Sequence, residues 1–170
     1  VITFGTDSFQ LGDLLGQPIQ WYGDEPGRPR PRLMDAGRLR EIQAAGITIG
    51  SHTVNHARLA ELEPAAQRRG LSASKAALGG LLGTPGRHLC YPFGSFNLEA
   101  VHAARAAGYA SATTCLRGAA RVADHPLALP RKAISFGDSL LGFAWKLGFK
   151  HAPTPELTAW RQRLKGREIL

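Results

Sequence analysis

Two histidines four residues apart are the first candidates for chemistry in this sequence. His52 and His56 lie in the run SHTVNH at residues 51–56, directly after an apolar stretch at 47–50 that predicts a short buried strand. If the chain turned into a helix there, this spacing would place both imidazoles on one face, about one turn apart. Neutral imidazole suits Zn²⁺ as a ligand. The pattern therefore indicates a metal site at a strand end; the alternative is a surface histidine pair at a helix start.

A second candidate is the turn that follows the strand predicted at residues 88–91. The segment CYPFG, residues 90–94, places Pro92 and Gly94 where the chain must leave the strand. These two residues fix a tight turn that can aim backbone N–H groups outward, and such groups can stabilise the oxyanion of a tetrahedral intermediate. The alternative is an ordinary strand-to-loop turn without a chemical role.

The elements that must position these residues alternate between helix and strand. Short apolar runs predict strands, and helical spacing between a capping residue and a terminal glycine predicts helices. Strands are expected at residues 1–4, 47–50, 88–91 and 109–115, with extended pieces at 127–130 and 134–136; helices are expected from Asp35 to Gly46, over 71–82, from Asn97 to Gly108 and over 158–165. Such alternation is typical of a parallel sheet or a barrel, where chemistry lies at the carboxyl ends of the strands.

The length and composition fit one globular domain with its own core. The chain has 170 residues, of which 44% are hydrophobic and 20% charged, which argues against a disordered tail, a fibrous repeat or a coiled coil. No apolar run approaches the roughly 20 residues of a membrane span. Cys90 and Cys115 are the only cysteines. Their spacing fits no disulfide framework or zinc motif, so both are expected to be small buried hydrophobic residues.

The net charge of +8 is concentrated near the C-terminus. Residues 146–170 carry six basic and two acidic side chains, which is +4 of that total. Because the rest of the chain lacks basic stretches interleaved with aromatics, no nucleic acid is expected as a partner. We expect a main domain at residues 1–152 and a basic helix or tail at 153–170. The stretch 140–149, with Trp145, Lys146 and the following Lys150, could lie on a membrane surface; a barrel-closing helix followed by a solvated tail is favoured.

Together these segments resemble the polysaccharide deacetylases of the NodB-homology type, carbohydrate esterase family 4. The resemblance rests on GITIGSHTVNHARL at residues 46–59, LCYPFGSFN at 89–97 and AGYASATT at 107–114, in this order. The later ALPRKAI, at 128–134, resembles a strand that follows in many members. The match covers most of the chain before residue 153.

This resemblance implies a fold, an activity and a set of site residues. The fold would be α/β, a distorted (β/α) barrel of the polysaccharide deacetylase type. The activity would be metal-dependent hydrolysis of N-acetyl or O-acetyl groups on sugars of a bacterial glycan or lipid-linked saccharide. His52 and His56 would hold the metal, most simply Zn²⁺, and the backbone of Phe93 would hold the oxyanion. The substrate groove would be lined by Tyr91, Pro92, Phe93 and Gly94.

The first motif of the family is altered in this sequence. Where members carry Thr-Phe-Asp-Asp-Gly, which supplies the base and a third metal ligand, this chain reads TFGTDSF at residues 3–9. In one interpretation Asp7 replaces the aspartate pair in a shifted register and acts as the catalytic base. In the other, which is favoured, an early helix and strand between Phe4 and Gly5 are missing and Asp7 is a loop residue. A catalytically impaired, deacetylase-like glycan-binding protein is therefore the alternative function.

Other candidate residues keep two interpretations each. Cys90 stands where many members place an arginine that orients the base. His125 and His151 are the only late histidines, and neither lies in the family's Leu-x-His motif. Arg131 could contribute to the site from its predicted strand or form a plain salt bridge, which is favoured. Trp21, half of an aromatic pair, could stack on a sugar ring or anchor its long loop.

Overall fold

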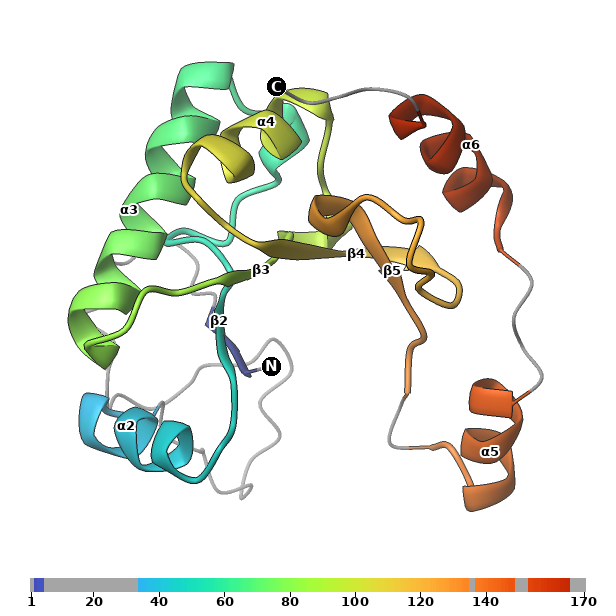
Figure 1. Cartoon of the computed structure of the whole chain (residues 1–170), viewed down its shortest axis with the longest axis horizontal. Helices are drawn as coiled ribbons and strands as arrows, with labels where there is room; N and C mark the ends of the chain where they lie inside the picture. Colours follow the sequence, from blue (N-terminus) through green and yellow to red (C-terminus); the bar gives the residue numbers. More distant parts are fainter. Residues whose placement is uncertain (1, 5–33, 135–136, 149–152, 166–170) are drawn as a thin grey trace, which may run out of the picture.

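A parallel β-sheet forms the centre of the molecule (Figure 1). The computed structural model describes residues 2–4, 34–134, 137–148 and 153–165. The strands of this part are β1 (Ile2–Phe4), β2 (Ile49–Ser51), β3 (His88–Cys90), β4 (Ser111–Arg117) and β5 (Leu129–Arg131). They pair in the order β1-β2-β3-β4-β5, and every pair is parallel. The carboxyl ends of all these strands therefore lie at one edge of the sheet.

Helices and short turns make the crossovers between the strands. The helices are α2 (Ala36–Ala44), α3 (Pro64–Leu82), α4 (Leu98–Ala106), α5 (Leu140–Gly148) and α6 (Pro155–Leu164), and the 3-10 turns are η1 (Leu59–Glu61), η2 (Pro92–Gly94) and η3 (Pro126–Ala128). Asp35 and Asn97 cap α2 and α4 as predicted, because each side chain accepts a hydrogen bond of 2.8 Å from a backbone N–H three residues on. Gly46 and Gly83 end α2 and α3 at positive φ, also as predicted.

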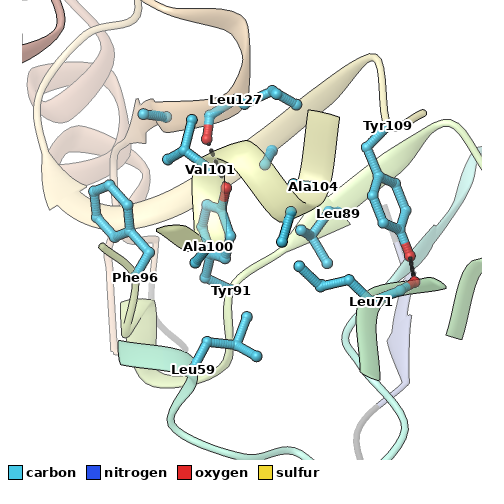
Figure 2. Close-up of a cluster of buried hydrophobic side chains, with 13 residues drawn as sticks. Leu59, Leu71, Leu89, Tyr91, Phe96, Ala100, Val101, Ala104, Tyr109 and Leu127 are labelled. Carbon is cyan, nitrogen blue, oxygen red and sulfur yellow. Dashed lines mark hydrogen bonds between the residues drawn. The ribbon is translucent and has the colours of Figure 1, made fainter. Parts of the chain in front are cut away.

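The core lies between the sheet and helices α3 and α4. Figure 2 shows its larger cluster, which includes Leu71 of α3, Leu89 of β3 and Val101 of α4, together with Tyr91, which follows β3. The buried Tyr91 hydroxyl donates a hydrogen bond of 2.9 Å to the carbonyl of Leu127, so burial leaves it satisfied. A smaller cluster joins α2, β2 and α3 and consists of Leu39, Ile49, Leu78 and Leu82. These two clusters fix β2 and β3, which end at the candidate residues.

Helix α6 packs on the body of the molecule, so the expectation of a solvated tail is wrong for residues 155–164. Leu157 is only 2% exposed, and the Trp160 ring stacks on Phe96 with centroids 4.3 Å apart. The Arg161 guanidinium forms two hydrogen bonds with the Asp124 carboxylate, at 2.6 and 2.8 Å. Leu157 and Trp160 are three residues apart and share one helix face, and this apolar face binds the helix to the sheet.

Helix α5 has no buried residue, and in the described part of the chain it closes no barrel, contrary to the expectation for this segment. Leu140 and Leu141 are 82% and 83% exposed, and Figure 1 shows α5 well apart from α3 and α4. Its other large apolar side chains, Phe143, Trp145 and Leu147, are also exposed. The extended piece expected at 134–136 is not a strand at Ile134, and its other two residues lie outside the described residues. No described helix is long and apolar enough to span a bilayer.

Candidate functional site

His52 is held at the junction of strands β2 and β3. It follows Ser51, the last residue of β2, which pairs with Leu89 of β3. Its Nδ1 lies 2.6 Å from the carbonyl oxygen of Cys90. Because a carbonyl only accepts hydrogen bonds, Nδ1 carries the proton, and the neutral ring presents an unprotonated Nε2. Burial is the main cause that lowers the pKa of His52, and the positive charge of Arg131 acts in the same direction, so the neutral form is favoured.

His56 reaches back to His52 from a loop, not from a helix. The two Nε2 atoms are 3.0 Å apart, and the rings meet edge to face with centroids 4.7 Å apart. The helix considered from the four-residue spacing does not form, because Thr53 and His56 adopt left-handed backbone conformations, with φ of 69° and 50°. These two residues curl the loop so that the imidazoles converge by another route.

Ser51 and Ser74 hold the base of this loop. Their hydroxyl oxygens are 2.5 Å apart, which ties the end of β2 to helix α3. The Ser51 hydroxyl also accepts a hydrogen bond of 3.3 Å from the backbone N–H of Thr53. Both serines and Thr53 are buried, so the histidine loop begins on a rigid support.

The turn after β3 divides into a buried half and an exposed half. The side chain of Tyr91 is 0% exposed and Pro92 is buried, so the structure places both in the core rather than along a substrate groove. The Phe93 side chain is 53% exposed, at φ 55°. Its ring lies 4.5 Å from the His56 ring, and the Arg58 guanidinium lies 4.4 Å above it. Of the expected groove residues, Phe93 is therefore the one whose side chain reaches the surface beside the histidines.

Gly94 and Cys115 form the close contact between this turn and strand β4. Gly94 has φ +67°, and a Cβ on it would lie 2.5 Å from the Cβ of Cys115. Cys115 is exposed, which makes the expectation of a buried thiol wrong here, whereas Cys90 is buried as predicted. The physical reason is the alternation of side chains along β4, because Ala112 and Thr114 occupy the buried face and Cys115 points to the opposite, more exposed face. Its sulfur accepts a hydrogen bond of 3.1 Å from Arg131.

A sequence model of known proteins decides which family this arrangement represents. The model described as polysaccharide deacetylase matches residues 14–112. The chain belongs to the polysaccharide deacetylase family. The family's α/β fold, a distorted barrel built on a parallel sheet, is thereby confirmed.

This chain spans only about a third to a half of the length of the named and solved relatives that it matches. YxkH of Bacillus subtilis (strain 168), named for the polysaccharide deacetylases, is 32% identical over 102 residues, which are 60% of this chain and 37% of YxkH. The Streptococcus pyogenes deacetylase PplD, in complex with acetate, has 25% identity and a TM-score of 0.65 over 68% of this chain and 51% of PplD. BC0361, a polysaccharide deacetylase from Bacillus cereus, has 25% identity and a TM-score of 0.60 over 68% of this chain and 37% of its own.

The histidine pair of this family member fits two ligands of one metal ion. Two imidazole nitrogens at the usual Zn–N distance in a tetrahedral site lie about 3.3–3.4 Å apart. The Nε2 atoms of His52 and His56 are separated by 3.0 Å, so a small outward shift of the rings would admit the ion. The Cys90 carbonyl orients His52 in the way that outer partners orient ligating histidines. Among the described residues no further His, Cys, Asp or Glu completes a group of three, so any third protein ligand lies elsewhere in the chain.

Several predicted residues take no part in the described site. Asp7, Trp21 and His151 lie outside the described residues. His125 accepts a hydrogen bond of 3.2 Å from the backbone N–H of Leu127 and so caps the turn η3. Arg131 forms no ion pair with a described carboxylate, so the favoured salt-bridge interpretation is wrong for that part of the chain.

Two residues at the site were missed from the sequence. Arg58 has no motif of its own, and its position two residues after His56 was the sole signal. Ser74 occupies a core position of α3 between Leu71 and Leu78. A serine at a position with helical core spacing is a signal for a buried hydrogen bond.

Proposed function

We propose that this family member hydrolyses the N-acetyl or O-acetyl group of a sugar in a bacterial glycan or lipid-linked saccharide, with Zn²⁺ bound by His52 and His56. The observation that carries the proposal is the convergence of the two Nε2 atoms, 3.0 Å apart, at the carboxyl end of β2. The family membership and the names of YxkH and PplD as deacetylases support it.

The proposed reaction on an N-acetyl sugar joins a water oxygen to the acyl carbon and breaks the carbon–nitrogen bond. Acetate leaves, and the amine nitrogen takes a proton from the water. A bound Zn²⁺ would lower the pKa of water and polarise the acetyl carbonyl. The chain's own contribution is to hold His52 neutral and oriented through Cys90. The backbone N–H of Phe93 would donate to the oxygen that gains charge, and the exposed Phe93 ring would contact the sugar.

Release of acetate from N-acetylglucosamine oligomers tests the activity. We expect the full chain with added Zn²⁺ to release acetate, and His52→Ala to reduce the rate by roughly 100-fold or more, because one metal ligand is lost. His102→Ala is the matched control, since His102 is an exposed histidine of α4, and it should keep the wild-type rate. Equal rates for His52→Ala and the control would contradict the proposal.

The zinc content of the purified protein tests the metal site separately. We expect the wild-type chain and His102→Ala to retain Zn²⁺ after dialysis, measured by mass spectrometry of the metal. His52→Ala and His56→Ala should each lose most of it, because a single imidazole is a weak site. Zinc content that is unchanged in both histidine variants would refute the assignment of the ligands.

Glycan binding without hydrolysis is the second candidate function. It is favoured by one feature of the sequence, that TFGTDSF at residues 3–9 stands where the family carries its Asp-Asp-Gly motif. Hydrolysis needs a base to take the proton from water, and a carboxylate is the family's solution. Measurable binding of N-acetylglucosamine oligomers with no acetate release at any added metal would favour this function over the first.

A further inference from the structure

Arg131 is brought to the site by an irregularity between strands β4 and β5. Thr113 pairs with Leu129 and Arg117 pairs with Arg131, so four residues of β4 advance against two of β5. The Thr114 hydroxyl closes this bulge. It donates a hydrogen bond of 3.2 Å to the carbonyl of Leu129 and accepts one of 3.1 Å from the N–H of Leu116. A bulge that re-aims side chains at a sheet edge is a recurrent feature of active sites.

The Arg131 guanidinium is linked both to the turn after β3 and to the histidine pair. Its Nη2 donates to the Cys115 sulfur at 3.1 Å, and Cys115 packs directly on Gly94 of the exposed turn. The guanidinium also interacts with the Cys90 thiol, and the carbonyl of Cys90 orients His52. Its positive charge acts on His52 as well. One cation therefore acts on His52 through its charge and reaches the turn through Cys115.

The partners of this guanidinium are poorly matched to its chemistry. A guanidinium presents a planar fork of N–H donors that fits the two oxygens of a carboxylate, whereas a thiol is a weak acceptor. Arg161 shows the satisfied arrangement, with both oxygens of Asp124 at 2.6 and 2.8 Å. Arg131 is exposed, and no carboxylate of the described residues pairs with its guanidinium. With respect to the described part of the chain, it therefore has N–H donors left that fit the two oxygens of an external carboxylate.

We propose that Arg131 forms a carboxylate-binding subsite beside the histidine pair. The carboxylate has two possible sources: the acetate that hydrolysis releases, which rests on the proposed function, or an acidic group on the sugar. Acetate is favoured, because the guanidinium interacts with Cys90 and contacts Cys115, which packs on Gly94, and Cys90 and Gly94 flank the place where the acyl group would react. In this role Arg131 would bind the acyl oxygens as they become a carboxylate, and it would set the affinity for the product.

Direct titration with acetate and with glucuronate, monitored by calorimetry or by ligand NMR, tests the subsite without any turnover. EDTA is added so that no metal ion contributes to binding. We expect the wild-type chain to bind acetate more tightly than glucuronate, and Arg131→Ala to weaken the binding roughly tenfold or more. Arg131→Lys should keep an intermediate affinity, since the charge remains without the fork. Arg117→Ala is the matched control, because Arg117 is the exposed register partner of Arg131 on β4.

The outcomes separate this inference from the proposed function. Arg131-dependent binding of acetate in a chain that releases none from glycans would support the subsite while the hydrolase proposal fails. Tighter Arg131-dependent binding of glucuronate than of acetate would also support it, and would assign the carboxylate to the sugar. Equal affinities in Arg131→Ala and wild type for both probes would overturn the inference, as would acetamide, the neutral analogue, binding as tightly as acetate.

Discussion

Backbone conformation at single residues decides where the side chains of the site point. Thr53, His56 and Phe93 have φ of 69°, 50° and 55° and are the non-glycine residues with positive φ in the described part of the chain. Each such residue costs on the order of 1–2 kcal/mol. The clustering of all of them around the histidine pair shows that contacts such as His52 with Cys90 and Phe93 with His56 offset local strain there.

Gly94→Ala tests the tightest of these backbone positions. The new Cβ would lie 2.8 Å from the backbone nitrogen of Cys115, and the residue would remain at φ +67°. Because backbone atoms cannot move aside as a flexible side chain can, we expect the free energy of unfolding to fall by about 2 kcal/mol or more. Urea denaturation followed by circular dichroism measures it.

Gly80→Ala is the matched control for this substitution. Gly80 lies inside α3 without positive φ, and a Cβ there meets nothing within 4 Å. Alanine should therefore stabilise the helix by about 0.5–1 kcal/mol. If Gly94→Ala were as stable as Gly80→Ala, the contact with Cys115 would not constrain the turn.

The two histidines and the turn after β3 could be predicted from the sequence, but the local geometry of the site could not. His52 and His56 could be predicted as site residues because they directly follow a strand, and active sites of parallel α/β folds lie at the carboxyl ends of the strands. The left-handed residues Thr53 and His56, which replace the expected helix, carry no sequence signal, since non-glycine residues seldom adopt that conformation. Arg131 reaches Cys115 only through a bulge that depends on pairing across strands.

At the scale of elements, helix α6 is fastened to the sheet by one apolar face and one ion pair. Leu157 is buried beside Gly118 of the β4 end, and Arg161 pairs with Asp124, whose side chain is 5% exposed. The sequence predicts a helix over residues 158–165, with Pro155 near its start; the structure begins it at Pro155, with Thr154 as the N-cap. Its docking depends on contacts between residues far apart in the sequence, such as Trp160 with Phe96, and no local pattern reports those.

Arg161→Ala tests the ion pair that holds α6. The hydrogen bond from Arg161 is the main cause that lowers the pKa of Asp124 from its ordinary value of 3.8. A carboxyl whose pKa is lower in the folded state stabilises that state above the unfolded pKa, and the contribution is lost as the pH falls through the folded pKa. We therefore expect Arg161→Ala to lose about 1.5–3 kcal/mol of unfolding free energy at neutral pH, and to lose less than this below about pH 4.

Urea denaturation at several pH values measures this difference. Arg68→Ala is the control, because Arg68 is an exposed arginine of α3 and its removal should change the unfolding free energy by less than about 0.5 kcal/mol. A difference between Arg161→Ala and wild type that grew on acidification would have the wrong sign for this pair.

At the scale of the whole molecule, buried apolar packing is distributed unevenly among the described helices. The parallel order β1 to β5 was predictable in kind, because helices and strands alternate with short connections. Most of the buried apolar side chains lie where α3 and α4 cover the sheet, as Figure 2 shows. Helix α5 contributes no buried residue to the core, although its sequence is more apolar than those of α3 and α4. The hydrophobicity of an element does not by itself determine what it packs against.

Leu71→Ala and Leu141→Ala, the same substitution at two leucines, measure this asymmetry. Leu71 is 0% exposed in the larger cluster, whereas Leu141 is 83% exposed on α5. Removing the buried side chain leaves a cavity among close-packed neighbours, so we expect Leu71→Ala to lower the unfolding free energy by about 2–5 kcal/mol. Leu141→Ala should change it by less than about 0.5 kcal/mol, because the exposed side chain loses no packing. A loss for Leu141→Ala comparable to that for Leu71→Ala, in the same urea denaturation assay, would show that the α5 face is covered in the folded protein.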